Sequence, residues 1–276
     1  MTWLHRAATV LAALAVSCSL AGQPRSPLVV TALANEGFLV EAAGHRVLID
    51  ALFRQGVEGY ATLSAATRTR LESAAAPFGD AAFVLSTHFH ADHFDPEAVA
   101  AYLTASPGSR FLSTPQALAR LTALSRPEVS ARADGLLPSG GRRAVREHRG
   151  VRVHALDIHH GRTRPIEHIG LLVELGGYRV LHIGDSEATA AELRASGAAA
   201  DPVDVFFVPY WYLTHDDGRQ AVRDVGARHV VVMHAASPAI DGTVRRAGGF
   251  RQLFEEMRKA FPNAVWLERE LDQVEF

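Results

Sequence analysis

Three histidines and an aspartate fall within the short stretch T-H-F-H-A-D-H, which directly follows an apolar run. In an extended segment His88 and His90 point to the same side, so they can hold one metal ion together. Asp92 and His93 come after the turn and face elsewhere, so they suit a second ion. Imidazole and carboxylate groups are ligands for Zn²⁺, Fe²⁺ or Mn²⁺. The stretch therefore predicts part of a site for two divalent ions.

Further candidate ligands lie just past the ends of other predicted strands. A histidine pair, His159 and His160, follows one apolar run, Asp185 follows a second, and His234 follows a third. Loops at strand ends, held by a rigid sheet, are where functional sites are usually assembled. The only cysteine of the chain is Cys18, so a metal site in the folded domain must be built from His, Asp and Glu. Together these segments offer enough nitrogen and oxygen ligands for two ions.

The elements that position these residues are predicted from apolar periodicity and from turn and cap signals. The helix after Asp95, for example, has an N-cap aspartate, a proline at its first position and an acidic first turn. Strands are expected at 28–33, 37–41, 46–50, 83–86, 111–113, 151–158, 169–175, 178–183, 203–208, 229–233 and 264–268. Helices are expected at 61–76, 96–104, from 115 onward, and at 187–196, 218–225 and 250–261. This order predicts an α+β protein, an αββα sandwich with two sheets face to face and helices outside.

The charge balance restricts the class of partner. The chain has 276 residues, 48% of them hydrophobic, and a formal net charge of −2, so it can bury a large core and has no basic surplus. Neither nucleic acid nor an anionic membrane surface is therefore an expected partner. A small-molecule substrate is expected instead.

The N-terminus has the features of an export signal. Residues 1–21 begin with positive charge, continue with an apolar run too short to span a bilayer, and offer a cleavage site after Ala21. Lipid attachment at Cys18 is the alternative. We expect an exported protein, periplasmic or extracellular, either soluble or a lipoprotein, with residues 28–276 as its folded domain.

The stretch at residues 87–93 resembles the H-x-H-x-D-H signature of the metallo-β-lactamase superfamily. Four further segments resemble that family and occur in its order. They are a hairpin ending in Asp50, the His159-His160-Gly161 segment, a strand leading to Asp185, and Val232-Met233-His234. The resemblance covers nearly the whole chain after the export signal, and it implies the αββα metallo-hydrolase fold.

Carried over residue by residue, the resemblance implies two ligand sets joined by Asp185. The sets are His88, His90 and His160 for the first ion, and Asp92, His93 and His234 for the second. Asp50 would hold the loop that carries the histidines. His160 is favoured over His159 because it precedes a small residue, Gly161, and His159 remains the alternative.

The resemblance also implies an activity, hydrolysis by a hydroxide that bridges two ions, with Zn²⁺ expected and Mn²⁺ or Fe²⁺ as alternatives. Asp185 would orient the nucleophile, and either Asp92 or a metal-bound water would pass a proton to the leaving group. Asp92 and Asp185 are therefore the candidate catalytic residues. True β-lactamases of the superfamily usually have Cys or Ser in place of the bridging aspartate. Asp185 therefore favours the lactonase, phosphodiesterase and thioester-hydrolase branches, especially the ascorbate-6-phosphate-lactonase-like group.

Two functions of other classes stay open. An iron-dependent oxidoreductase resembling the persulfide dioxygenases would use the same ligands. A non-catalytic metal-binding domain would be expected to have lost some of them, whereas here the set is intact.

Several other residues are candidates for the pocket around the ions. His159, His168 and His215 lie in predicted loops. The aromatic run Tyr210, Trp211 and Tyr212 follows a buried strand, and three consecutive aromatic side chains cannot all face one core. We therefore expect this run to form a wall of the substrate pocket.

Overall fold

The structure is a computed structural model that describes residues 25–161, 163 and 165–276. The predicted export signal, with Cys18, lies outside the described residues. Within the described ranges, none of the helices has both the length and the apolar character that crossing a membrane requires.

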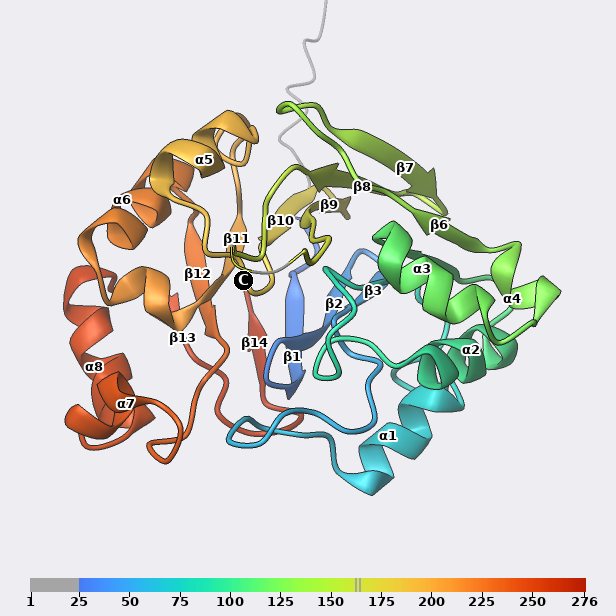
Figure 1. The fold of residues 1–276 in the computed structure, drawn as a ribbon, viewed down its shortest axis with the longest axis horizontal. Coiled ribbons are helices and arrows are strands. Elements are labelled where there is room, and N and C mark those ends of the chain that lie inside the picture. Colours follow the sequence, from blue (N-terminus) through green and yellow to red (C-terminus); the bar gives the residue numbers. More distant parts are fainter. Residues whose placement is uncertain (1–24, 162, 164) are drawn as a thin grey trace, which may run out of the picture.

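Two seven-stranded sheets, formed by the described residues, pack face to face (Figure 1). The first has the order β14 (Gln273–Glu275), β1 (Val29–Ala34), β2 (Gly37–Ala42), β3 (His45–Ile49), β4 (Phe83–Leu85), β5 (Arg110–Ser113) and β6 (Ala133–Gly135). The second has the order β13 (Ala264–Val265), β12 (His229–Met233), β11 (Val205–Pro209), β10 (Tyr178–His182), β9 (Gly170–Leu175), β8 (Val151–Leu156) and β7 (Ala144–His148).

Helices cover the outer faces of both sheets. The first four are α1 (Ala65–Glu72), α2 (Pro96–Ala105), α3 (Pro115–Thr122) and α4 (Pro127–Ser130). The others are α5 (Ala190–Ala195), α6 (Asp216–Val225), α7 (Gly242–Arg246) and α8 (Phe250–Ala260), with a 3-10 helix η1 (Tyr210–Leu213) before α6. Figure 1 shows α1 to α4 on one side of the two sheets and α5 to α8 on the opposite side. The predicted αββα sandwich is confirmed.

The core lies in three apolar layers, one between the sheets and one under each group of helices. Along β2, Phe38 and Val40 belong to the inner layer, whereas Leu39 between them packs under α1 to α4. This is the two-residue period of a strand buried on both faces. The ring of Phe38 lies 4.5 Å from that of Phe207 on β11, so the inner layer joins the two sheets.

Parallel strands bring the candidate ligands to one edge of the sandwich. In the first sheet β3 pairs in parallel with β4, and in the second sheet β10, β11 and β12 run parallel. The segments after these strands carry Asp50, the histidine stretch, Asp185 and His234. Because the carboxyl ends of parallel strands share an edge, residues far apart in sequence meet there.

The structure corrects the bounds of several predicted elements. The helix expected at 61–76, for example, is confined to Ala65–Glu72. The helix expected at 187–196 begins only at Ala190, because Thr189 and Glu192 form a capping box there. Residues 187–189 are thus left free to line a cleft. The final strand expected at 264–268 ends at Val265, and the chain returns to the first sheet, where β14 pairs with β1.

Candidate metal centre

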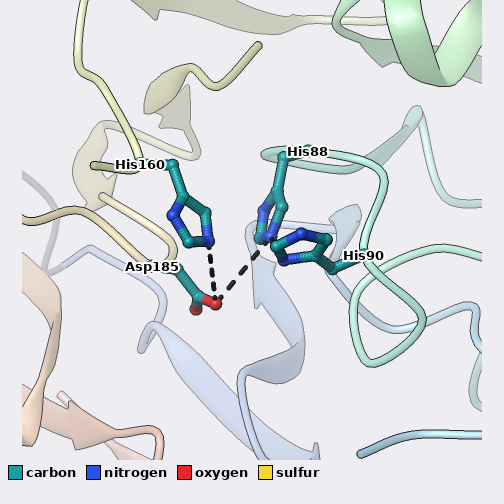
Figure 2. Close-up of side chains that lie close together, drawn as sticks. All are labelled: His88, His90, His160 and Asp185. Carbon is teal, nitrogen blue, oxygen red and sulfur yellow. Dashed lines mark hydrogen bonds and ion pairs between the residues drawn. The ribbon is translucent and has the colours of Figure 1, made fainter. Parts of the chain in front are cut away.

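Four side chains from three different loops converge on one point (Figure 2). Ligand atoms of His88, His90, His160 and Asp185 all lie within 4.8 Å of one another. Nε2 of His88 lies 2.9 Å from Nδ1 of His90. Oδ2 of Asp185 lies 3.5 Å from Nε2 of His160 and 3.8 Å from Nε2 of His88. Three imidazoles and one carboxylate form a compact set for one divalent ion.

A second group shares Asp185 with the first. Ligand atoms of Glu36, His93, Asp185 and His234 also lie within 4.8 Å of one another. Here the other carboxylate oxygen, Oδ1 of Asp185, lies 3.1 Å from Nε2 of His93 and 3.3 Å from Nε2 of His234. The two oxygens of Asp185 thus face two different ligand groups, as the resemblance implied for the bridging aspartate.

Several atoms of these groups are buried without a hydrogen-bond partner among the described residues. They are Nε2 of His93, Nε2 of His160, Oδ1 of Asp185 and both carboxylate oxygens of Glu36. Buried polar atoms are normally hydrogen-bonded, since leaving one unpaired costs about 1–3 kcal/mol. Divalent cations would satisfy all of these atoms, so the residues present fit two metal ions.

Asp50 orients two of the histidine ligands, one directly and one through Thr87. Its Oδ2 lies 2.9 Å from Nδ1 of His93 and accepts a hydrogen bond from the hydroxyl of Thr87 at 2.8 Å. That hydroxyl lies 3.1 Å from Nδ1 of His88. With both Nδ1 atoms engaged, Nε2 of each ring is left to face the ions, the usual arrangement of carboxylate, histidine and metal. Burial alone would raise the pKa of Asp50, but His93 and Thr87 outweigh it, so the pKa is lowered.

Two residues of the site have strained backbone conformations. Asp50 has φ of 46° and His234 has φ of 59°, in the left-handed region that non-glycine residues rarely adopt. Strain of this kind persists where the surrounding structure over-determines the conformation, and it concentrates at functional sites. Both residues directly follow strands, so the strained turn directs each side chain toward the centre.

The electrostatics keep Asp185 ionised and His234 neutral. Burial would raise the pKa of Asp185, but His93, His160 and His88 beside it hold that pKa well below its usual range. Burial lowers the pKa of His234 to about 3. An ionised carboxylate and a neutral imidazole are the forms that bind metal.

Asp92 and Glu36 are the residues for which sequence and structure differ most. Asp92 was expected in the second ligand set. Its Oδ1 is 3.9 Å from Nε2 of His93, and the compact group around His93 includes Glu36 but not Asp92. Oδ2 of Asp92 accepts a hydrogen bond from Asn35 at 3.4 Å, so Asp92 lies beside the group. Glu36 could not be recognised as a site residue from the sequence, because an acidic residue in an Asn-Glu-Gly turn is usually solvated.

The histidine pair divides between two environments. Nε2 of His160 faces Asp185, whereas Nε2 of His159 lies 3.3 Å from Oε2 of Glu192, at the start of α5. His159 therefore stays outside both ligand groups. His168 is buried next to the first group, with its ring 5.2 Å from that of His88. Its Nδ1 lies at hydrogen-bond distance, 2.8 Å, from the carbonyl oxygen of Ile158.

A cleft with a volume of about 500 Å³ opens onto the centre. Its lining includes Tyr60, Glu187, Thr189, Trp211, Tyr212, His215 and Asp217 beside His160, Asp185 and His234. The ring of Trp211 packs 4.8 Å from that of His234, and its Nε1 donates a hydrogen bond to the carbonyl oxygen of Ser186. Tyr210 does not line this cleft, which corrects the expectation that all three aromatic residues form its wall. Its hydroxyl donates instead to Asp241 at 2.6 Å.

The fold and the centre together define a class of protein. Residues 45–235 match the family described as beta-lactamase superfamily domain. The chain belongs to the metallo-β-lactamase superfamily, whose members are mostly metal-dependent hydrolases. A search of curated protein sequences finds no significant match.

Solved structures share the fold at low sequence identity. The metallo-beta-lactamase fold protein YhfI from Bacillus subtilis is 14% identical, with a TM-score of 0.60 over 91% of this chain and 100% of that one. An isothiocyanate hydrolase from Delia radicum gut bacteria is 13% identical, with a TM-score of 0.57 over 90% of this chain and 99% of that one. CmlA, a diiron beta-hydroxylase from Streptomyces venezuelae, is 15% identical, with a TM-score of 0.61 over 92% of this chain and 55% of CmlA.

Proposed function

We propose that this protein is a dinuclear metal-dependent hydrolase. The observation that carries the proposal is the position of Asp185, whose two carboxylate oxygens face two separate groups of ligands. Two divalent ions bound there would lower the pKa of water toward about 7 and so supply hydroxide at neutral pH. Zn²⁺ is the ion we propose first, since imidazole nitrogens dominate the first group.

Two carboxylates divide the proton chemistry between them. Asp185 is held ionised, so it can accept a hydrogen bond from the nucleophile and orient it. Burial raises the pKa of Asp92, and the negative charge of Asp185 adds to that rise against the opposing effect of His93. Asp92 lies beside the second ligand group, within reach of a bound substrate, so we assign it the transfer of a proton to the leaving group.

Tyr60 is placed to stabilise charge that develops on the substrate. Its ring packs 4.3 Å from that of His234. Tyr60 lines the cleft described above and also a second pocket, which shares His160, Asp185 and His234 with that cleft. Its hydroxyl makes no hydrogen bond to the described residues. Burial and the nearby carboxylates Asp185 and Asp92 raise the pKa of Tyr60 to about 12, so it stays protonated. A phenol of this kind can donate a hydrogen bond to an oxyanion.

The part of the cleft wall that the structure describes carries negative charge. None of the described residues that line it is Lys or Arg, and Glu187 and Asp217 add negative charge to its wall. These two carboxylates, which lie outside the metal centre, would repel a phosphorylated substrate or a phosphodiester. Trp211 offers an apolar face. We therefore favour an uncharged ester, lactone or thioester over phosphodiesters and over the phosphorylated lactones of the ascorbate-6-phosphate-lactonase-like group.

A substrate panel tests the proposal. Uncharged esters, lactones and thioesters would be compared with phosphodiesters on one preparation, before and after chelation, and again after Zn²⁺ or Mn²⁺ is restored. We expect turnover of at least one uncharged class, its loss on chelation and its return with metal. Hydrolysis that survives complete removal of metal would refute the proposal.

An iron-dependent oxidoreductase is the second candidate. The observation that favours it is the second ligand group, where two carboxylates, Glu36 and Asp185, accompany two imidazoles, a set that also suits iron. Oxygen consumption by the iron-loaded protein in the presence of persulfide or other reduced substrates would distinguish it, since a hydrolase consumes no oxygen.

A further inference from the structure

Glu36 is a fully buried acidic residue at a turn, a place where acidic residues are usually exposed. It lies between β1 and β2, follows Asn35 with φ of 48°, and has 0% of its surface accessible. Neither carboxylate oxygen has a hydrogen-bond donor among the described residues. Burying an ionised carboxylate without a hydrogen-bond donor is unfavourable, so a cation beside it would stabilise this side chain.

The carboxylate of Glu36 points at the second ligand group. Its Oε1 lies 3.0 Å from Nε2 of His234, and its Oε2 lies 3.6 Å from Nδ1 of His93. The same Nε2 of His234 is 3.3 Å from Oδ1 of Asp185. Ligand atoms of Glu36, His93, Asp185 and His234 therefore converge around one point.

The backbone of Glu36 is tied to the loop that carries Asp185. The amide of Gly184 donates to Nδ1 of His182 at 3.1 Å, so Nε2 of that ring bears the proton. Nε2 donates in turn to the carbonyl oxygen of Glu36 at 3.2 Å. A Cβ atom at Gly37 would lie 2.9 Å from the carbonyl oxygen of Asp50, so the turn also packs closely on the segment below it. These contacts hold the side chain in a defined position.

We propose that Glu36 is a direct ligand of the second metal ion. This inference deepens the proposed function, because it rests on the same two-ion centre, but it concerns metal binding and not turnover. The second ion would then have two carboxylates, Glu36 and Asp185, with His93 and His234, whereas the first would have a single carboxylate. Carboxylates favour harder ions, so the second site would retain Mn²⁺ better than the first site does.

Calorimetric titration of the metal-free protein with Mn²⁺ and Zn²⁺ tests this assignment. The wild type is expected to bind two ions. In Glu36→Gln the affinity for one ion should fall by at least about 10-fold, with the larger loss for Mn²⁺, while the other ion binds as before. Glu255→Gln, on the exposed face of α8, is the matched control and should bind both ions like the wild type.

The choice of glutamine separates a ligand from a structural residue. Its amide has almost the same shape and keeps a polar group beside His234, so a merely structural role for Glu36 leaves metal affinity unchanged in E36Q. Two ions bound by E36Q with wild-type affinities would overturn the inference and leave the dinuclear hydrolase standing. A wild type that binds fewer than two ions would count against both.

A second variant covers the case in which E36Q does not fold, as judged by circular dichroism of the metal-free protein. Glu36→Asp keeps the carboxylate but shortens its reach by one methylene, so it should bind the second ion more weakly than the wild type. Wild-type affinity for both ions in E36D would contradict a ligand held at this distance.

Discussion

Oδ2 of Asp50 lies 2.9 Å from Nδ1 of His93, with both side chains fully buried beneath the metal centre. The same carboxylate accepts hydrogen bonds from the amide and the hydroxyl of Thr87, the residue before His88. One buried aspartate thus controls the orientation of a ligand from each group. The hairpin that ends in Asp50 is therefore part of the site although it contributes no ligand.

Replacing Asp50 with asparagine should weaken metal binding at the second group. The variant keeps the shape of the side chain but removes the charge that favours the Nδ1–H form of His93, so affinity for one ion should fall by about 10–100-fold. Competition with a fluorescent chelator measures this. Asp216→Asn, at the exposed start of α6, is the control. Equal affinities in the two variants would show that Asp50 does not orient the ligand.

The two adjacent histidines should behave differently when each is changed to alanine. His160 faces Asp185, whereas His159 faces Glu192, so only H160A removes a ligand. H160A should lose the first ion, leaving about one ion per chain, and H159A should keep both. Elemental analysis after dialysis provides the measurement. Loss of an ion from H159A, with H160A unaffected, would reverse the assignment.

Removing the hydroxyl of Tyr60 should slow turnover without loosening substrate binding. In Tyr60→Phe we expect kcat to fall by about 10²-fold with little change in KM, because the hydrogen bond forms only as charge develops. Metal content should stay at the wild-type value. A change confined to KM would show instead that Tyr60 only binds the substrate.

The stability of the metal-free protein should fall as the pH is lowered from 6.5 toward 4. Burial lowers the pKa of His182 from 6.5 to about 4, so in this window the unfolded state binds a proton that the folded state does not. Each such histidine contributes a slope of up to about 1.4 kcal/mol per pH unit. Burial lowers the pKa of His168 to about 3, so it adds to the trend. The pKa of His93 is raised despite burial, because of Asp185 and Asp50, so its effect lies above pH 6.5.

Urea unfolding at several pH values checks this expectation. His182→Gln should flatten the slope between pH 6.5 and 4, whereas His45→Gln, on the partly exposed β3, should not. An unchanged slope in H182Q would show that His182 is not the titrating group.

The sequence was most informative where ligands follow apolar strands. The buried runs before His88, Asp185 and His234 could be recognised as strands, and parallel strands bring such ends together. The αββα fold followed from the order of these elements and from the family resemblance. The strand predictions rest on apolar periodicity, which is a local property of the chain.

The place of Glu36 in the site could not be predicted from the local sequence. Its neighbours Asn35 and Gly37 indicate a turn, and nothing in that turn signals that the side chain is buried against the second sheet. Only the packing of β2 against β11, through Phe38 and Phe207, brings the turn over the centre. The return of the chain to β14 is likewise a tertiary event, because that strand is short and pairs with β1 at the opposite end of the sequence.

Anomalous X-ray scattering from crystals of the Zn²⁺- or Mn²⁺-loaded protein tests the two-ion centre most directly. We expect two peaks, one on each side of the Asp185 carboxylate. The first should lie among His88, His90 and His160, and the second between His93 and His234 and next to Glu36. A single peak, or peaks away from Asp185, would contradict the two-ion centre.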